Sequence, residues 1–172
     1  MKKLLKKVLL CLVMAFTSLS TFATVKLTDG SATCLKGEHQ IDVVLDLENL
    51  KYQETKPLSD FIERAPRVDN WQQESLQMFS LYFNKTGSKY GMMSAPVRTN
   101  AAYVLYVCPV NVDTKGRLKG AAYLKDSKTL ETVATFDFAT NDGDWDDRIT
   151  LQDPLSELGE DLAHLLKKEI NK

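Results

Sequence analysis

Residues 101–112 read AAYVLYVCPVNV, and the prediction of the fold starts from this stretch. Apolar residues occupy both of its alternating faces, and β-branched and aromatic side chains are frequent. That composition is typical of a strand inside a sheet that is covered on both faces. Pro109 has no backbone N–H to donate, so we expect the pairing of this strand to loosen near its end.

The residues that follow predict two further strands joined by short loops. Residues 113–116, DTKG, have the composition of a hairpin loop, and 118–125 is the next strand. A turn at 126–128 leads to a strand at 131–138, where apolar residues alternate. Because short loops join antiparallel neighbours, we expect these three strands to form an antiparallel meander.

The segment before the meander predicts one strand and two helices. Residues 41–48, IDVVLDLE, alternate between apolar and acidic side chains, as in a half-buried strand. A short helix at 58–65 is expected to end at Pro66. A longer helix at 69–87, with Asp69 as its cap, then returns the chain to the sheet. Strands separated by helices predict a crossover connection, which places two strands parallel in one sheet.

Both ends of the globular part add elements to this layout. Residues 25–27 and 32–35 are consistent with an extra N-terminal β-hairpin. Residues 153–170 predict a helix with Asp153 as cap, Pro154 at its first position and a stripe of leucines. The predicted class is α+β: a single mixed, mostly antiparallel sheet in the order β-α-α-β-β-β-α, with its helices packed on one face.

Residues 1–23, MKKLLKKVLLCLVMAFTSLSTFA, have the three-part layout of a secretory signal peptide. Four lysines precede an apolar run at 8–16, and small residues at Thr21 and Ala23 predict cleavage after Ala23. The apolar run is too short for a membrane anchor, and no later segment could span a bilayer. Residues 24–172 are predicted to form a single domain in the periplasm or outside the cell.

The charges of the 172-residue chain are unevenly distributed. The whole chain has 22 Lys plus Arg and 23 Asp plus Glu, but the predicted signal peptide contains four Lys and no acid. The remaining chain therefore has 18 basic and 23 acidic side chains, a net charge of -5. This acidic excess argues against nucleic acid as a partner.

Two cysteines remain after signal cleavage, because Cys11 lies in the leader. In an exported protein, Cys34 and Cys108 predict one disulfide. The alternative is two separate buried thiols, since a free cysteine behaves as a small apolar residue. Cys34 and His39 are neighbours in sequence, but sequence proximity does not define a catalytic pair.

Residues 141–147 read NDGDWDD and form the most acidic stretch of the chain. Asp142, Asp144, Asp146 and Asp147 supply the carboxylate oxygens that Ca²⁺ prefers, so they are the candidate metal ligands. The spacing of these residues does not match an EF-hand loop. The alternative is a solvated turn, because turns favour Asn, Asp and Gly. No other metal or cofactor is predicted.

Several short motifs resemble those of small secreted proteins of the Bacteroidota. They are LKGE at 35–38, DLENLKY at 46–52, DNW at 69–71, AYVL at 102–105 and LGEDLAHLLKK at 158–168. The layout is also similar to the amino-terminal α/β domain of TolB-type envelope proteins. This resemblance implies an accessory or interaction role in the cell envelope with a protein partner, and it implies no catalytic residue.

Three hypotheses about function follow. The first is an exported, non-catalytic binding or assembly module of the cell envelope, favoured because no catalytic motif is recognisable. The second is a Ca²⁺-dependent binding domain that uses the acidic stretch 141–147. The third is a small hydrolase whose catalytic residues carry no sequence signature.

Overall fold

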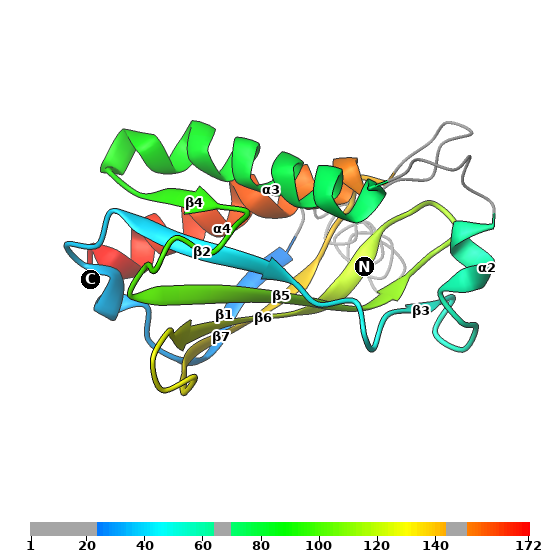
Figure 1. Ribbon diagram of the computed structural model, residues 1–172, viewed down its shortest axis with the longest axis horizontal. Helices are drawn as coiled ribbons and strands as arrows, with labels where there is room; N and C mark the ends of the chain where they lie inside the picture. Colours follow the sequence, from blue (N-terminus) through cyan, green and yellow to red (C-terminus); the bar gives the residue numbers. More distant parts are fainter. Residues whose placement is uncertain (1–23, 64–69, 144–150) are drawn as a thin grey trace, which may run out of the picture.

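The computed structural model describes residues 24–63, 70–143 and 151–172, and within them seven strands form one mixed sheet (Figure 1). The strands are β1 (Thr24–Gly30), β2 (Gln40–Leu45), β3 (Lys51–Tyr52), β4 (Met93–Ala95), β5 (Tyr103–Val112), β6 (Leu118–Asp126) and β7 (Thr132–Ala139). Their order is β1-β7-β6-β5-β2-β4, with β3 paired to β5. The expected α+β class is confirmed.

The two long helices lie on one side of this sheet, and the short helix α2 (Ser59–Ile62) lies at one end of the molecule beside β3 (Figure 1). The long helices are α3 (Trp71–Gly87) and α4 (Gln152–Ile170), with single 3-10 turns η1 (Thr33–Leu35) and η2 (Ser88–Tyr90). The two long helices, α3 and α4, run over the same face. The apolar core lies between them and the sheet.

The predicted meander is confirmed. Strands β5, β6 and β7 pair antiparallel with their neighbours. The register of β5 against β6 shifts between Pro109 and Asn111, where the missing N–H of proline led us to expect looser pairing.

The expected crossover is confirmed as well, because β2 lies parallel to β5. On its other edge β2 is parallel to the short strand β4. The two-residue strand β3 pairs with the end of β5 and was not predicted. A pair of residues is too short to give an alternating pattern.

The expected N-terminal hairpin is wrong. Residues 33–35 form the 3-10 turn η1, and β1 pairs antiparallel with β7. Ala32 and Leu35 are both fully buried. A spacing of three residues brings both side chains to one side of a helical turn, whereas a strand would turn them to opposite faces.

Helix boundaries differ slightly from expectation. Helix α4 begins at Gln152, so Asp153 lies in its first turn, where a carboxylate favours the helix dipole. After α3 the chain forms the single turn η2, and the short strand β4 begins at Met93. Pro66 and the predicted cap Asp69 lie outside the described residues.

Helices α3 and α4 pack closely at Gly159. A Cβ atom added there would overlap the carbonyl oxygen of Phe79 on α3, which is backbone and cannot move aside by rotation. The neighbouring Leu158 and Leu162 are fully buried against the same core. Glycine is therefore required at this position by the approach of the two helices.

Replacing Gly159 with Ala should destabilise the protein by about 1–3 kcal/mol, because the added methyl group forces the helices apart. The measurement is urea-induced unfolding of the purified protein. Lys168→Ala, on the exposed side of the same helix, is the matched control and should have little effect. A Gly159→Ala protein that gained about 1 kcal/mol, as in an unconstrained helix, would contradict this packing.

Candidate functional site

The face of the sheet opposite α3 and α4 carries no described helix, and we call it the open face (Figure 1). Strand register defines it: Val44, Tyr106, Tyr123 and Thr135 lie side by side on four neighbouring strands. Residues one position along these strands, such as Leu105 and Leu124, are fully buried in the core. The open face therefore has its own side chains, which come from alternate positions of the same strands.

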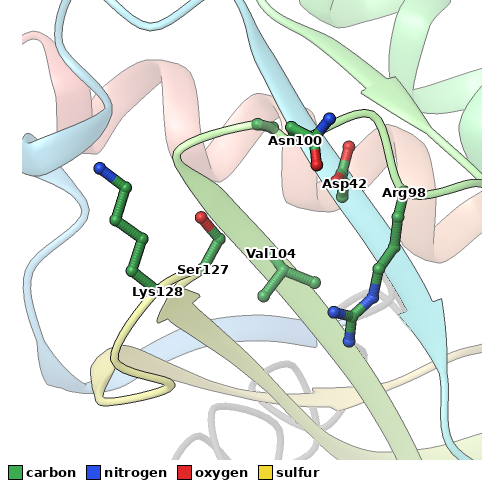
Figure 2. Close-up of a pocket in the computed structure, with 7 residues that line it drawn as sticks. Asp42, Arg98, Asn100, Val104, Ser127 and Lys128 are labelled. Carbon is green, nitrogen blue, oxygen red and sulfur yellow. The ribbon is translucent and has the colours of Figure 1, made fainter.

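One end of the open face is hollowed into a cavity of about 240 Å³, which we call the basic pocket (Figure 2). Its lining comes from β2, β5, the loop before β5 and the turn after β6. The lining residues are Asp42, Arg98, Asn100, Ala101, Val104, Ser127 and Lys128. Because β5 and β6 are antiparallel, the start of one and the end of the other meet at this place.

Asp42 is the fixed acidic group of the basic pocket. Its side chain sits on β2 opposite Val104 of β5, and only 4% of the residue is exposed. Thr99 donates to both carboxylate oxygens, from its backbone N–H at 2.9 Å and from its hydroxyl at 2.6 Å. The Gln40 amide donates in turn to the Thr99 hydroxyl at 2.5 Å. This chain of hydrogen bonds satisfies a buried carboxylate and fixes its orientation.

Arg98 lies at the boundary between the basic pocket and the rest of the open face. Its guanidinium donates to the Tyr106 hydroxyl at 3.1 Å, and Lys125 Nζ lies 4.9 Å from the centroid of the Tyr106 ring. The tyrosine thus interacts with two cations, one at its hydroxyl and one at its ring. A single hydrogen bond leaves most of the guanidinium donors available to a ligand.

Lys128 lies on the other side of Val104 from Arg98 (Figure 2). The turn that carries it is held by Asp126, whose carboxylate accepts from the backbone N–H groups of Lys128 at 2.8 Å and Thr129 at 2.9 Å. These hydrogen bonds lower the pKa of Asp126. Among the described residues, neither Arg98 nor Lys128 forms an ion pair.

The basic pocket therefore combines two exposed cations, one buried carboxylate and neutral groups at Asn100 and Ser127. Such a set can bind a polar ligand and orient it. The formal charge of the lining is positive, since two cations face one carboxylate. Anions are accordingly favoured over cations.

A second cavity, of about 210 Å³, lies beside α3 and α4 and is acidic. It is lined by Tyr82, Asp142, Asp153, Ser156, Glu157, Glu160 and Asp161. Burial, followed by the charges of Glu157 and Glu160, raises the pKa of Asp161. Glu157 is used as an acceptor: one oxygen binds the backbone N–H groups of Asn141 at 2.8 Å and Asp142 at 2.9 Å.

Of the four candidate calcium ligands, only Asp142 is described, and it lines this acidic cavity. Asp144, Asp146 and Asp147 lie outside the described residues. Within the described part of the chain, no three His, Cys, Asp or Glu side chains are grouped to hold a metal ion. Calcium binding by residues 141–147 therefore stays a prediction.

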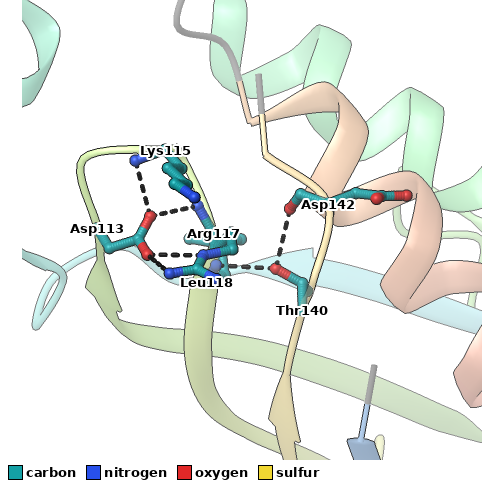
Figure 3. A network of polar contacts seen from close by, with 6 residues as sticks. All are labelled: Asp113, Lys115, Arg117, Leu118, Thr140 and Asp142. Atoms are coloured by element: carbon teal, nitrogen blue, oxygen red, sulfur yellow. Dashed lines mark hydrogen bonds and ion pairs between the residues drawn. The ribbon is translucent and has the colours of Figure 1, made fainter. Parts of the chain in front are cut away.

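Asp142 is connected to the turn between β5 and β6 (Figure 3). The Thr140 hydroxyl donates to the Asp142 carbonyl at 3.3 Å and accepts from the Leu118 N–H at 2.9 Å. In the turn, Asp113 accepts from Arg117 Nε at 2.7 Å. Burial opposes ionisation of Asp113, but the hydrogen bonds from Arg117 and from backbone N–H groups outweigh it and lower the pKa. This polar network gives residues 140–142 a structural role.

The expected disulfide is absent, because Cys34 and Cys108 are both free. Cys34 packs against the helix-side core near Tyr103, at the start of β5. Cys108 lies on the open face of β5. It follows Tyr103 by five residues, which is about 17 Å along the strand. A bridge needs Cα atoms within about 7 Å. The structure corresponds to the alternative of two separate thiols, each half-buried.

Comparisons with known proteins give only distant similarities. No protein-family model matches the chain, and no curated protein is significantly similar to it. A PelC dodecamer from Paraburkholderia phytofirmans is similar in structure, with a TM-score of 0.42 and 14% identity over 87% of this chain and 97% of that chain. A leucine-to-methionine variant of the PelC dodecamer from the same organism has a TM-score of 0.41, 15% identity and the same coverage. Neither function nor assembly can be transferred at this distance.

Sequence reasoning did not identify the basic pocket. Its charged groups come from three separate segments, around Asp42, Arg98 and Lys128, and no motif joins them. The buried acidic residue on β2 was the only available signal, since the alternating pattern of 41–48 placed Asp42 on the more polar face.

Over the described residues, no helix is long and apolar enough to cross a membrane.

We expect two free thiols when the unreduced mature protein, residues 24–172, is titrated in denaturant, and one in its Cys108→Ser variant. In the native protein Cys108 should react slowly at neutral pH. Burial, with a smaller contribution from the Asp46 charge, raises its pKa to about 11. Its thiolate fraction is then roughly 100-fold below that of an ordinary cysteine. If the titration finds no free thiols before reduction, Cys34 and Cys108 form a disulfide and the arrangement of two separate thiols is wrong.

Asp161→Asn should stabilise the protein at pH 7, by a few tenths of a kcal/mol, because the side chain is partly exposed and screened. The raised pKa of Asp161 means that its charge opposes folding at neutral pH. The gain should disappear below about pH 4, where the wild-type carboxyl is protonated in both states. Thermal unfolding across this pH range is the measurement. Glu131→Gln, an exposed control away from the cavity, should show no such dependence.

Proposed function

We propose that this protein is an exported, non-catalytic binding or assembly module of the cell envelope, and that it binds an envelope protein through its open face. The observation that carries the proposal is the composition of that face. Three of its four central positions, Val44, Tyr106 and Tyr123, are apolar or aromatic, the fourth being Thr135, and Val110 at its far end is 50% exposed. A solvated sheet face ordinarily presents polar side chains at such positions.

The distribution of residue types on the open face supports a role in protein binding. Tyrosine and arginine are enriched in interfaces and among the residues that contribute most to binding energy. Tyr106 and Tyr123 are direct cross-strand neighbours, and Arg98 and Lys125 flank Tyr106. An apolar and aromatic centre with charges beside it is the usual anatomy of an interface.

Export is supported by the sequence of residues 1–23, which lie outside the described residues. Strand β1 begins at Thr24. Cleavage after Ala23 would therefore leave all seven described strands intact. The mature protein in the periplasm or outside the cell would keep the complete open face and the basic pocket.

The state of the two thiols and of Asp42 favours binding over catalysis. A nucleophilic cysteine requires a lowered pKa, whereas burial raises the pKa of Cys34 and of Cys108. Both oxygens of Asp42 already accept hydrogen bonds from Thr99. This arrangement suits a group that orients a ligand.

Affinity capture from native envelope with the mature protein as bait tests the proposal. A reproducible partner should be retained, and Tyr123→Ala should weaken its binding at least 10-fold, since central aromatic residues dominate interface energies. Leu81→Ala is the matched control, because Leu81 is 60% exposed but lies on α3. Thermal unfolding should confirm that both variants are folded.

The proposal would be overturned by capture that Tyr123→Ala leaves unchanged, or by the absence of any reproducible partner. Turnover of a member of a hydrolase substrate panel by the wild-type protein would favour the hydrolase hypothesis instead.

A further inference from the structure

We propose that the basic pocket is a binding site for a small hydroxylated carboxylate of the sugar-acid class. This goes beyond the proposed function, because the site would bind a small molecule whether or not the open face binds a protein. Arg98 belongs to both ideas, because it lines the pocket and contacts Tyr106. Lys128 belongs to the pocket alone and Tyr123 to the open face alone, so these two side chains separate the ideas.

The size of the basic pocket restricts the ligand. Its volume of about 240 Å³ lies below the roughly 300–1,000 Å³ of sites for drug-sized molecules. A single sugar-sized unit fits this space, whereas a nucleotide or an extended peptide would not be enclosed.

The two cations of the basic pocket select an anionic group. Arg98 and Lys128 lie on opposite sides of Val104, and neither forms a salt bridge within the described ranges, although the charge of Lys128 interacts with the nearby Asp126 carboxylate. The Arg98 guanidinium is anchored to Tyr106 by one donor, which leaves the rest of its planar fork free. That fork matches the two oxygens of a carboxylate, and Lys128 adds a second positive charge.

Asp42 determines what must accompany the anionic group. Its oxygens are buried and each already accepts one hydrogen bond, so the remaining lone pairs can accept from a ligand donor but repel an anion. Asn100 and Ser127 add neutral hydrogen-bonding groups. Several hydroxyl groups near one carboxylate satisfy this set.

Charge balance distinguishes hydroxyl donors from an ammonium group. Among the lining side chains, Arg98 and Lys128 together with Asp42 leave one net positive charge. A sugar acid with one negative charge neutralises it, while a zwitterionic amino acid leaves it unbalanced. Val104 provides an apolar surface for the C–H groups of a sugar ring.

Binding can be measured by titrating the ¹⁵N-labelled exported protein with glucuronate and following backbone amide signals by NMR. We expect shifts at Thr99, Asn100 and Ser127, with a Kd on the order of 1 mM, as is usual for a ligand of so few atoms. Glucose, which lacks the carboxylate, and acetate, which lacks the hydroxyl groups, should each bind at least 10-fold more weakly.

Three variants test whether Arg98 and Lys128 bind the carboxylate of glucuronate. Arg98→Ala should weaken glucuronate binding at least 10-fold, and Lys128→Ala should weaken it several-fold. Arg98→Lys keeps the charge but loses the planar fork, so its affinity for glucuronate should lie between those of Arg98→Ala and the wild-type protein. Lys119→Ala removes the same charge from an exposed position of β6 outside the basic pocket, so it is the matched control and should bind normally.

Equal binding of glucose would overturn the need for an anionic group, and equal binding of acetate would overturn the sugar-acid class. If glucuronate still shifts the amide signals of Arg98→Ala, or shifts no signals of the wild-type protein, the proposed binding site is wrong. None of these outcomes bears on partner capture through Tyr123, so failure of the pocket and failure of the proposed function can be told apart.

Discussion

Strand β5 forms backbone hydrogen bonds along both of its edges, with β6 on one side and with β2 and then β3 on the other. Its side chains also contribute to both layers of the molecule. Leu105 and Val107 are fully buried beneath the helices, while Val104 and Tyr106 belong to the open face. A shift of one residue in its register would exchange these two sets, so the core and the candidate site depend on the same pairing.

The basic pocket follows from that pairing and from two connections. The loop that carries Arg98 enters β5 where the turn that carries Lys128 leaves β6, because the two strands are antiparallel. Asp42 reaches the same place from β2, which runs parallel to β5. Hydrogen bonds within the loop and the turn then fix the side chains: Thr99 holds Asp42, and Asp126 holds the turn at Lys128. Pairing between strands thus positions charges that lie far apart in sequence.

Sequence patterns predicted the elements better than their long-range partners. The apolar run 101–112 and the leucine stripe of 153–170 indicated β5 and α4 because each buries a wide surface with a clear period. The segment 32–35 was misassigned because four residues cannot separate a strand from a helical turn. Cys34 and Cys108 show the limit most clearly: their number suggested a bridge, but the count of cysteines carries no information about distance. The basic pocket had no signature, since its three segments meet only in the folded sheet.

Strand β1 has a consequence for the order in which the protein is completed. It pairs only with β7, and Thr24 faces Ala139, which lies 115 residues later in the chain. During synthesis at about 5–20 residues per second, β1 waits roughly 6–23 seconds for its partner strand. Through that interval its backbone donors and acceptors remain unpaired, and closing so long a loop is slow. One edge of the sheet is therefore finished last, and the nascent chain must be kept from pairing with other chains until then.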